Sequence, residues 1–298
     1  MRYLLAVLFL ISMASAQGLL YGNVIYLPPM ERAIVVSKSK QKLIVVQIKN
    51  GIPEVMDSSI AITGFKFGDK KELGDMKTPE GVYFPKSYKP KNQLPPAYGI
   101  GAYPLNYPNA LDKYIIHRNG DGIWIHATDK ENPLFFSSKG CVILTNRDFA
   151  KISDYIKINK TPVIIQENFV MLDENKYKQL RQSIDDFLNR WQKVLLDIYK
   201  GKTDGIFSVY SPYFNFAGGD IFDLKTQFKK EFYSINNNEP FVHILNKKAF
   251  LDKRRNQTYY VIAFKLAYLS GDEIKAVNKV LYLIRDKGQL KIITEENL

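Results

Sequence analysis

The chain of 298 residues contains a single cysteine, Cys141, and three histidines, of which His126 is nearest to it in sequence. A lone Cys with a His elsewhere in the chain is a candidate nucleophile and base, because the thiolate is the reactive form and an imidazole can stabilise it. The alternative is a buried Cys that acts as a small hydrophobic residue. The small and polar residues Ser138, Lys139 and Gly140 before the sulfur favour the nucleophile.

The segment that carries His126 predicts a β-strand. Period two places Ile123 and Ile125 on one face, and Trp124 and His126 on the other. A His at a strand end, beside an aromatic residue, is placed to turn its ring into a cleft. The alternative is a hydrogen-bonded structural histidine. His117, just upstream, has the same two interpretations: a residue at the rim of the cleft or a structural one.

Four stretches in order along residues 33–166 carry a shared signature. They are Gly74–Tyr83 with its Thr-Pro-x-Gly-x-Tyr pattern, Leu105–Asn109, Gly122–Thr128 with its His-small-Thr end, and Ser138–Val142, which reads Ser-x-Gly-Cys-Val. Together they resemble the YkuD-type L,D-transpeptidases, which remodel bacterial peptidoglycan. The continuation after the Cys is most similar to the branch with the cell-shape L,D-carboxypeptidases of helical bacteria.

The resemblance implies a mainly β catalytic domain, a YkuD-like mixed β-sandwich, that performs acyl transfer. In it, Cys141 attacks a peptide carbonyl and His126 takes or holds the thiol proton. The carbonyl of Ala127 orients the imidazole, and backbone N–H groups near Gly140 and Cys141 stabilise the oxyanion.

Two positions depart from the family pattern. Ala127 stands where the family usually has Gly, which a role for the backbone carbonyl tolerates. Ile143 stands where the family often has an Arg that contacts a substrate carboxylate, so Lys139 or Arg147 is the expected substitute. The expected substrate-binding residues are therefore Trp124, Ser138, Lys139, Arg147 and His117.

The expected substrates are peptidoglycan stem peptides. The branch resemblance and the accessory C-terminal region favour an L,D-carboxypeptidase that removes terminal D-Ala from tetrapeptides and influences cell shape. One alternative is an L,D-transpeptidase that cross-links stems. Another is an inactive wall-binding protein, suggested by Ile143.

The N-terminus predicts export. Arg2, the apolar run Leu4–Met13 and the Ala-Ser-Ala sequence at 14–16 are typical of a cleavable signal peptide over residues 1–16. The expected location is the periplasm, without stable membrane insertion. Cysteines in an oxidising compartment are usually paired, so the single Cys141 indicates a chemical role.

The net charge of +12 is compatible with nucleic acid, anionic lipid or an acidic polymer as partner, and also with a merely solvated surface. No nucleic-acid-binding motif is present, so the carboxylate-bearing cell wall is favoured among the partners, while a solvated surface is favoured over any charge-driven partner. Three scattered histidines and one cysteine form no ligand set, so no metal or cofactor is expected. Nothing in the sequence sets the oligomeric state.

The length predicts two domains: after an N-terminal segment, 17–32, a catalytic domain spans 33–167 and an accessory domain 174–298. Residues 85–110 are rich in Pro and Tyr, and are expected to form an ordered excursion without regular structure that walls or covers the cleft, or else a packed surface loop. In the catalytic domain the patterns predict strands Ala33–Val36, Lys42–Ile48, Ser58–Thr63 and Thr161–Ile165, and a helix Asn146–Ile156.

The C-terminal region predicts an α+β domain. Its order of elements resembles the nuclear-transport-factor-like cone-shaped fold, and a binding or positioning role is favoured over a second active site. Asp220 and Asp223 are interpreted as helix N-cap residues rather than as a catalytic pair. The expected elements are a long helix Glu174–Tyr199, a helix Leu224–Phe232, and strands Phe241–Leu245, Tyr259–Leu269, Lys279–Arg285 and Gln289–Thr294.

Overall fold

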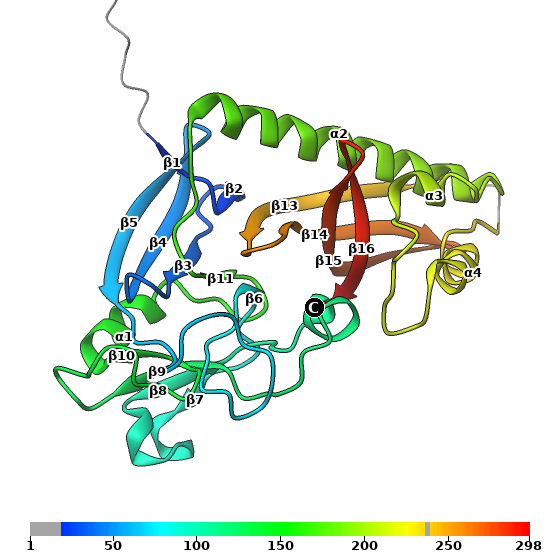
Figure 1. Ribbon diagram of the computed structural model, residues 1–298. Helices are drawn as coiled ribbons and strands as arrows, with labels where there is room; N and C mark the ends of the chain where they lie inside the picture. The colour runs from blue at the N-terminus through cyan, green and yellow to red at the C-terminus, as the bar shows by residue number, and fades with distance from the viewer. Residues whose placement is uncertain (1–18, 236–238) are drawn as a thin grey trace, which may run out of the picture.

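The computed structural model describes residues 19–235 and 239–298 (Figure 1). The predicted signal peptide, 1–16, lies outside these residues. The β-rich N-terminal part lies beside the C-terminal sheet, and one long helix runs along the top of the molecule over that sheet. No helix within the described residues is long and apolar enough to span a bilayer.

The N-terminal half contains two sheets. The first has the order β5-β4-β3-β11-β6, with β11 parallel to β3 and the other pairs antiparallel. The second has the order β10-β9-β8-β7, with β9 and β10 parallel. The strands are β3 (Ala33–Ser37), β4 (Lys42–Lys49), β5 (Ile52–Ile60), β6 (Gly81–Tyr83), β7 (Lys89–Pro90), β8 (Gly101–Pro104), β9 (Trp124–Thr128), β10 (Val142–Thr145) and β11 (Val163–Gln166), and the helix α1 is Asn146–Ser153.

The β-branched runs form strands where the patterns predict them. β3 and β4 make the expected hairpin, and Asn50 and Gly51 form the next turn with φ of 52° and 78°, the left-handed conformations that Asn and Gly tolerate best. β5 begins directly after that turn and ends at Ile60, so the strand expected from 58 to 63 is confirmed only for residues 58–60, and its predicted bounds were wrong. The long hairpin pairing with β4 extends β5 toward the turn.

The expectation that residues 85–110 lack regular structure was also wrong. The segment contains strands β7 and β8 and two short 3-10 helices, η1 (Lys91–Gln93) and η2 (Pro96–Tyr98). Proline is tolerated here because β7 is an edge strand and Pro96 opens η2, where a backbone donor is not needed. After β8 follows a short π-helix, η3 (Leu111–Ile115).

The C-terminal half is the expected α+β unit. α2 spans Glu174–Tyr199, as predicted; the side chain of Asp173 caps its N-terminus, and its apolar side chains pack on the sheet. Asp220 and Asp223 form a capping box on α4, which confirms their structural interpretation. The other elements are α3 (Ile206–Val209), α4 (Ile221–Glu231), β13 (Val242–Lys253), β14 (Thr258–Ser270), β15 (Glu273–Asp286) and β16 (Gln289–Asn297), in the antiparallel order β16-β15-β14-β13.

The N-terminal segment and a shared core join the two halves. β1 (Leu20–Tyr21) pairs with β12 (Met171–Leu172), and β2 (Val24–Tyr26) extends the C-terminal sheet by pairing with β13. One apolar cluster takes side chains from both halves, so the face of the C-terminal sheet that turns away from α2 packs against the N-terminal half. The C-terminal sheet therefore lies within reach of loops that belong to the site.

Candidate active site

Cys141 and His126 lie on one face of two neighbouring parallel strands. In the register of β9 and β10, Ile143 stands opposite His126. Residues directly opposite each other share a face, and alternate residues along a strand return to the same face. Two residues before Ile143 is Cys141, so the thiol and the imidazole are diagonal neighbours. The strand predicted for His126 is therefore confirmed, and its pairing with β10 brings the two candidate residues together.

A tight loop presents the thiol at the start of β10. The hydroxyl of Ser138 donates to the carbonyl of Cys141 (2.7 Å) and accepts the N–H of Gly140 (3.0 Å). Gly140 has a φ of 132°, and a Cβ there would lie 2.9 Å from the carbonyl oxygen of Lys77. Only glycine meets both conditions without strain. Ser138, which is buried, thus braces the loop, and its hydroxyl is already used there.

The backbone fixes the orientation of His126. Nδ1 of the imidazole lies 2.8 Å from the carbonyl oxygen of Ala127, which can only accept, so Nδ1 carries the proton and donates. In the neutral ring Nε2 is then the free acceptor. Burial lowers the pKa of His126 from its ordinary value of 6.5, and the bond to Ala127 offsets this only in part. The ring is therefore neutral at pH 7 and able to accept a proton.

Burial raises the pKa of the half-buried Cys141 thiol. The backbone N–H of Trp124 and the ammonium of Lys70 oppose this shift because both favour the thiolate. The sulfur also lies 3.5 Å from the carbonyl oxygen of Gly122, to which the thiol donates. With the thiol and imidazole pKa values both shifted toward the neutral forms, the resting site is a thiol beside a neutral imidazole.

Tyr98 covers the imidazole, and sequence reasoning did not single it out. Its ring lies 4.3 Å from that of His126 and 5.4 Å from that of Trp124, centroid to centroid. The Cys141 thiolate is among the groups that raise the pKa of Tyr98, after burial, so the phenol is also close to the sulfur. The available signal was the group of tyrosines among the prolines of 85–110. Tyr98 makes part of that segment a wall of the site.

Lys70 is a second residue that sequence reasoning missed. It is buried, and its ammonium pairs with Asp75 (2.7 Å) and donates to the carbonyl of Glu72 (2.9 Å). Asp75 also accepts the backbone N–H groups of Lys71, Glu72 and Lys77, which closes the loop around the ion pair. This loop supplies the Lys77 carbonyl that contacts Gly140. Lys70 is thus the cation that the structure places near the sulfur.

The remaining candidate residues are farther from the thiol or more exposed. Lys139 is exposed in the loop before Gly140. Arg147 lies in the first turn of α1, beyond the opposite end of the four-residue β10, which is roughly 13 Å long, and its side chain is 92% exposed. His117 is also exposed, with a φ of 57°. Ile143, at the position of the family Arg, pairs with Ile62 through two backbone hydrogen bonds.

Of the two backbone N–H groups expected to stabilise the oxyanion, only one is free in this loop to do so. The N–H of Gly140 already donates to Ser138, which leaves the N–H of Cys141 as the candidate donor in this loop. An oxyanion site requires N–H donors that point at the developing negative charge, and the Gly140 N–H points at Ser138 instead.

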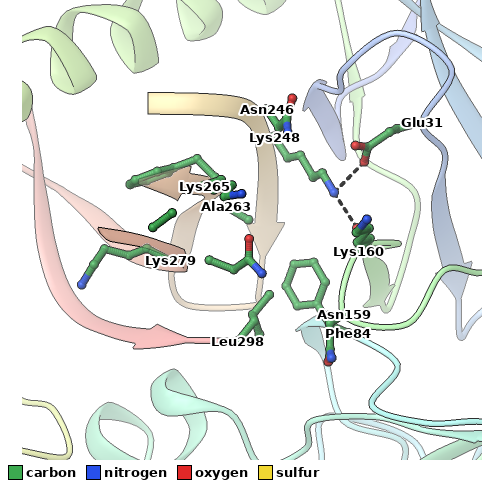
Figure 2. Close-up of a pocket in the computed structure, with 13 residues that line it drawn as sticks. Glu31, Phe84, Asn159, Lys160, Asn246, Lys248, Ala263, Lys265, Lys279 and Leu298 are labelled. Atoms are coloured by element: carbon green, nitrogen blue, oxygen red, sulfur yellow. Dashed lines mark hydrogen bonds and ion pairs between the residues drawn. The ribbon is translucent and has the colours of Figure 1, made fainter. Parts of the chain in front are cut away.

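A separate hollow lies between the two halves (Figure 2). Its volume is about 380 Å³, and it lies among β13, β14 and β15 on one side and Phe84 and residues 159–160 on the other. Lys248 lines the hollow, and its ammonium pairs with Glu31 and donates to the carbonyl of Lys160 (2.7 Å) at one edge of it. Within 19–235 and 239–298, no group of three or more His, Cys, Asp or Glu side chains is arranged to hold a metal ion.

Comparisons with known proteins agree with this geometry. The model of the YkuD family, described as the L,D-transpeptidase catalytic domain, matches residues 31–165. That range includes both strands of the site, the loop around Lys70 and the segment with Tyr98. No protein with a curated description matched the chain.

Two solved structures are similar over both halves. Bd1075 of Bdellovibrio bacteriovorus shares 25% identity, with a TM-score of 0.74 over 94% of this chain and 98% of that one. Pgp2 of Campylobacter jejuni, described as a helical cell shape determining protein, shares 24% identity, with a TM-score of 0.73 over 93% of this chain and 95% of that one. The fold of the whole chain, accessory half included, is therefore also found in these proteins.

Proposed function

Since residues 31–165 belong to the YkuD family of L,D-transpeptidase catalytic domains, a cysteine-dependent enzyme type, we propose that this protein is a murein L,D-carboxypeptidase. Its substrate is the tetrapeptide stem of peptidoglycan, and its products are the tripeptide and free D-Ala. The single observation that carries the proposal is the placement of Cys141 and His126 on one face, with Nδ1 of the imidazole held by the Ala127 carbonyl.

The first half-reaction transfers the acyl group to sulfur. Nε2 of His126 takes the proton of the Cys141 thiol as the sulfur attacks the carbonyl of the L-centre of meso-diaminopimelate. The carbonyl π electrons move to oxygen, and the N–H of Cys141 donates to that oxyanion. A good donor of this kind contributes roughly 3–4 kcal/mol in other enzymes. As the oxyanion collapses, the C–N bond to D-Ala breaks and the imidazolium returns its proton to the leaving amine.

The second half-reaction releases the thioacyl-enzyme. A water molecule gives a proton to His126 and its oxygen attacks the thioester, which yields the tripeptide carboxyl group and restores the thiol. An amine of a neighbouring stem in place of water forms a cross-link instead. The first half-reaction is common to both outcomes, so the acceptor decides between hydrolysis and transpeptidation.

Two observations favour hydrolysis. The accessory half resembles, in fold, that of Pgp2, which is described as a helical cell shape determining protein. Tyr98 covers one face of the His126 imidazole, which leaves less room beside the base for a bulky acceptor stem than for water. Transpeptidation remains the second candidate because the family takes its name from that reaction. A wall-binding protein without activity is the third, and Ile143 in place of the family Arg is its motivation.

The proposed place of action is the periplasm. The sequence of residues 1–16 has the features of a signal peptide, and the YkuD family acts on peptidoglycan. Trimming of stem peptides there removes donors for further cross-linking, which is how such an enzyme influences cell shape.

The test is an incubation of the mature protein, and of Cys141→Ala, with a purified disaccharide-tetrapeptide, followed by mass spectrometry. Tripeptide and free D-Ala that are absent with Cys141→Ala support the proposal. A dimeric cross-linked product moves the protein to the transpeptidases. An unchanged substrate with a folded wild-type protein favours the wall-binding alternative.

A further inference from the structure

An arginine of the C-terminal sheet reaches into the catalytic half. Arg254 lies in the turn between β13 and β14, and its side chain is 8% exposed. Its guanidinium bonds to both carboxylate oxygens of Asp252. Nη1 then lies 3.6 Å from a carboxylate oxygen of Asp69 and 3.9 Å from one of Asp112, both in the catalytic half.

Asp69 accepts contacts from both halves of the chain. It lies at the start of the loop around Lys70, which runs from Asp69 to Glu80. One of its oxygens accepts the backbone N–H of Glu80 (2.7 Å), and the other pairs with Arg118 as well as with Arg254. Arg118 in turn donates to the carbonyl of Glu80 (3.0 Å). The two ends of the loop, at 69 and 80, are therefore held together by a buried cluster of charges that includes one residue from the accessory half.

This loop leads directly to the nucleophile. Lys70 follows Asp69 in the chain and pairs with Asp75, whose carboxylate accepts the N–H of Lys77 (3.0 Å). The carbonyl of Lys77 is the atom against which Gly140 packs, one residue before Cys141. A displacement of Asp69 thus moves both the nearby cation and the support of the loop that presents the sulfur.

We propose that Arg254 is a positioning residue for the reaction: through Asp69 it fixes the loop that holds Lys70 and supports Gly140 beside the thiol. The accessory half then contributes a residue that positions the active-site loop, in addition to any binding surface that it provides. The inference rests on the proposed role of Cys141 as nucleophile. Because an arginine stays protonated at every physiological pH, the anchor does not vary with pH.

Asp252 holds the guanidinium of Arg254 in one orientation. It is fully buried, and Nε2 of Gln166, at the end of β11, donates to it at 3.0 Å. The carboxylate is thereby held from the catalytic sheet while it accepts three hydrogen bonds from Nε and Nη2 of the guanidinium, which orient the arginine. A lysine in place of Arg254 keeps the charge but cannot reproduce this fork.

The test uses the only cysteine of the chain as a reporter. The rate of Cys141 alkylation by iodoacetamide is measured across roughly pH 6 to 10, which brackets an ordinary thiol. Arg254→Gln is compared with Arg255→Gln, because Arg255 is the exposed neighbour in the same turn. Thermal unfolding of each variant establishes that it is folded.

For Arg254→Gln we expect the alkylation midpoint to move to higher pH, with alkylation about threefold or more slower at neutral pH because less thiolate is present. Arg255→Gln should match the wild type. Asp69→Asn should give a shift at least as large, because it also loses the pair with Arg118, and the double variant should add little to Asp69→Asn alone, since Asp69→Asn already breaks the Arg254 contact. Arg254→Lys should recover only part of the effect.

A lower unfolding temperature with an unchanged alkylation profile would show that Arg254 is merely structural and would overturn the inference, as would additive shifts in the double variant. If Arg254→Gln does not fold, Arg254→Lys and Asp69→Asn carry the same comparison. The alkylation assay does not depend on muropeptide turnover. Failure of the proposed function, with no D-Ala release by the wild type, is therefore distinguishable from failure of this inference.

Discussion

The phenol ring of Tyr98 lies 4.3 Å from the imidazole of His126, centroid to centroid, and tilts 38° from it. The contact joins the Pro- and Tyr-rich segment 85–110 to the candidate base. It excludes water from one face of the imidazole, and burial is the main cause of the lowered pKa of His126. Tyr98 therefore has two roles that experiments can separate: it holds the ring in place and keeps it dry.

Tyr98→Ala should lower kcat/KM on the tetrapeptide roughly 3- to 10-fold, because an aromatic pair of this kind contributes about 0.5–1.5 kcal/mol beyond its buried area. Tyr98→Phe keeps the ring and should stay near the wild-type value. Steady-state release of D-Ala provides the measurement. Equal losses in both variants would assign the effect to the hydroxyl and not to stacking.

The pH profile follows from the direction of the His126 shift. The base must be neutral, so kcat/KM should fall only below the ordinary histidine value of 6.5, at the lowered pKa of the buried ring. In Tyr98→Ala the ring gains water, its charged form is less disfavoured, and the acid limb should move to higher pH. If the acid limb stays in place in Tyr98→Ala, Tyr98 does not lower the pKa of His126, and this account of the pH profile is wrong.

Gly140→Ala tests the loop that presents the thiol. A Cβ at this position meets the Lys77 carbonyl at 2.9 Å, and the φ of 132° is open almost only to glycine. The loop has to shift, at a cost of roughly 1–3 kcal/mol, so activity should fall about 5- to 150-fold. Gly51→Ala is the matched control, since Gly51 also has a positive φ but nothing lies within 4 Å of its Cβ position. Full activity in Gly140→Ala would mean that the loop tolerates displacement.

Asp75 links the stability of the site loop to pH. Burial alone raises its pKa, but the Lys70 ammonium and three backbone donors outweigh this and lower it to about 2 from 3.8. The folded state therefore gains about 2 kcal/mol above pH 3.8, and this contribution is lost as the pH falls from 3.8 toward 2.

Asp75→Asn removes that charge and leaves Lys70 buried without its counter-ion, which should cost roughly 3 kcal/mol or more at pH 7. Urea unfolding at neutral and acidic pH measures both effects, and the deficit should shrink as the pH falls to about 2. Glu54→Gln, in an exposed pair with Lys49, is the control and should change stability by less than about 1 kcal/mol. A deficit that does not depend on pH would contradict the ionic account.

Local patterns predict some elements to the residue. Helix α2 is one, because its apolar side chains keep a single helical period, Asp173 provides the N-cap, and Gly201 follows its end. The choice of Cys141 and His126 also came from the sequence, through residue chemistry and the family signature. The structure adds that the parallel pairing of β9 and β10 puts both side chains on one face.

The contacts that the sequence did not reveal are all between distant segments. Tyr98 reaches His126 only because η2 folds back over β9, and Lys70 approaches Cys141 only because Asp75 closes its loop. Arg254 comes from the other half of the chain. No local period encodes such contacts, since they depend on how loops and sheets pack. Lys139, in the loop before Gly140, and Arg147, in the first turn of α1, are both exposed. Nearness in sequence to Cys141 therefore says little about where a side chain lies.

The central claim, acylation of Cys141 with His126 as base, is tested most directly by intact-protein mass spectrometry after exposure to a carbapenem. The account predicts one covalent adduct on the wild type, none on Cys141→Ala, and an adduct that forms about 10²- to 10⁴-fold more slowly on His126→Ala. A folded wild type that stays unmodified, or a Cys141→Ala variant that acquires the same adduct, would contradict it.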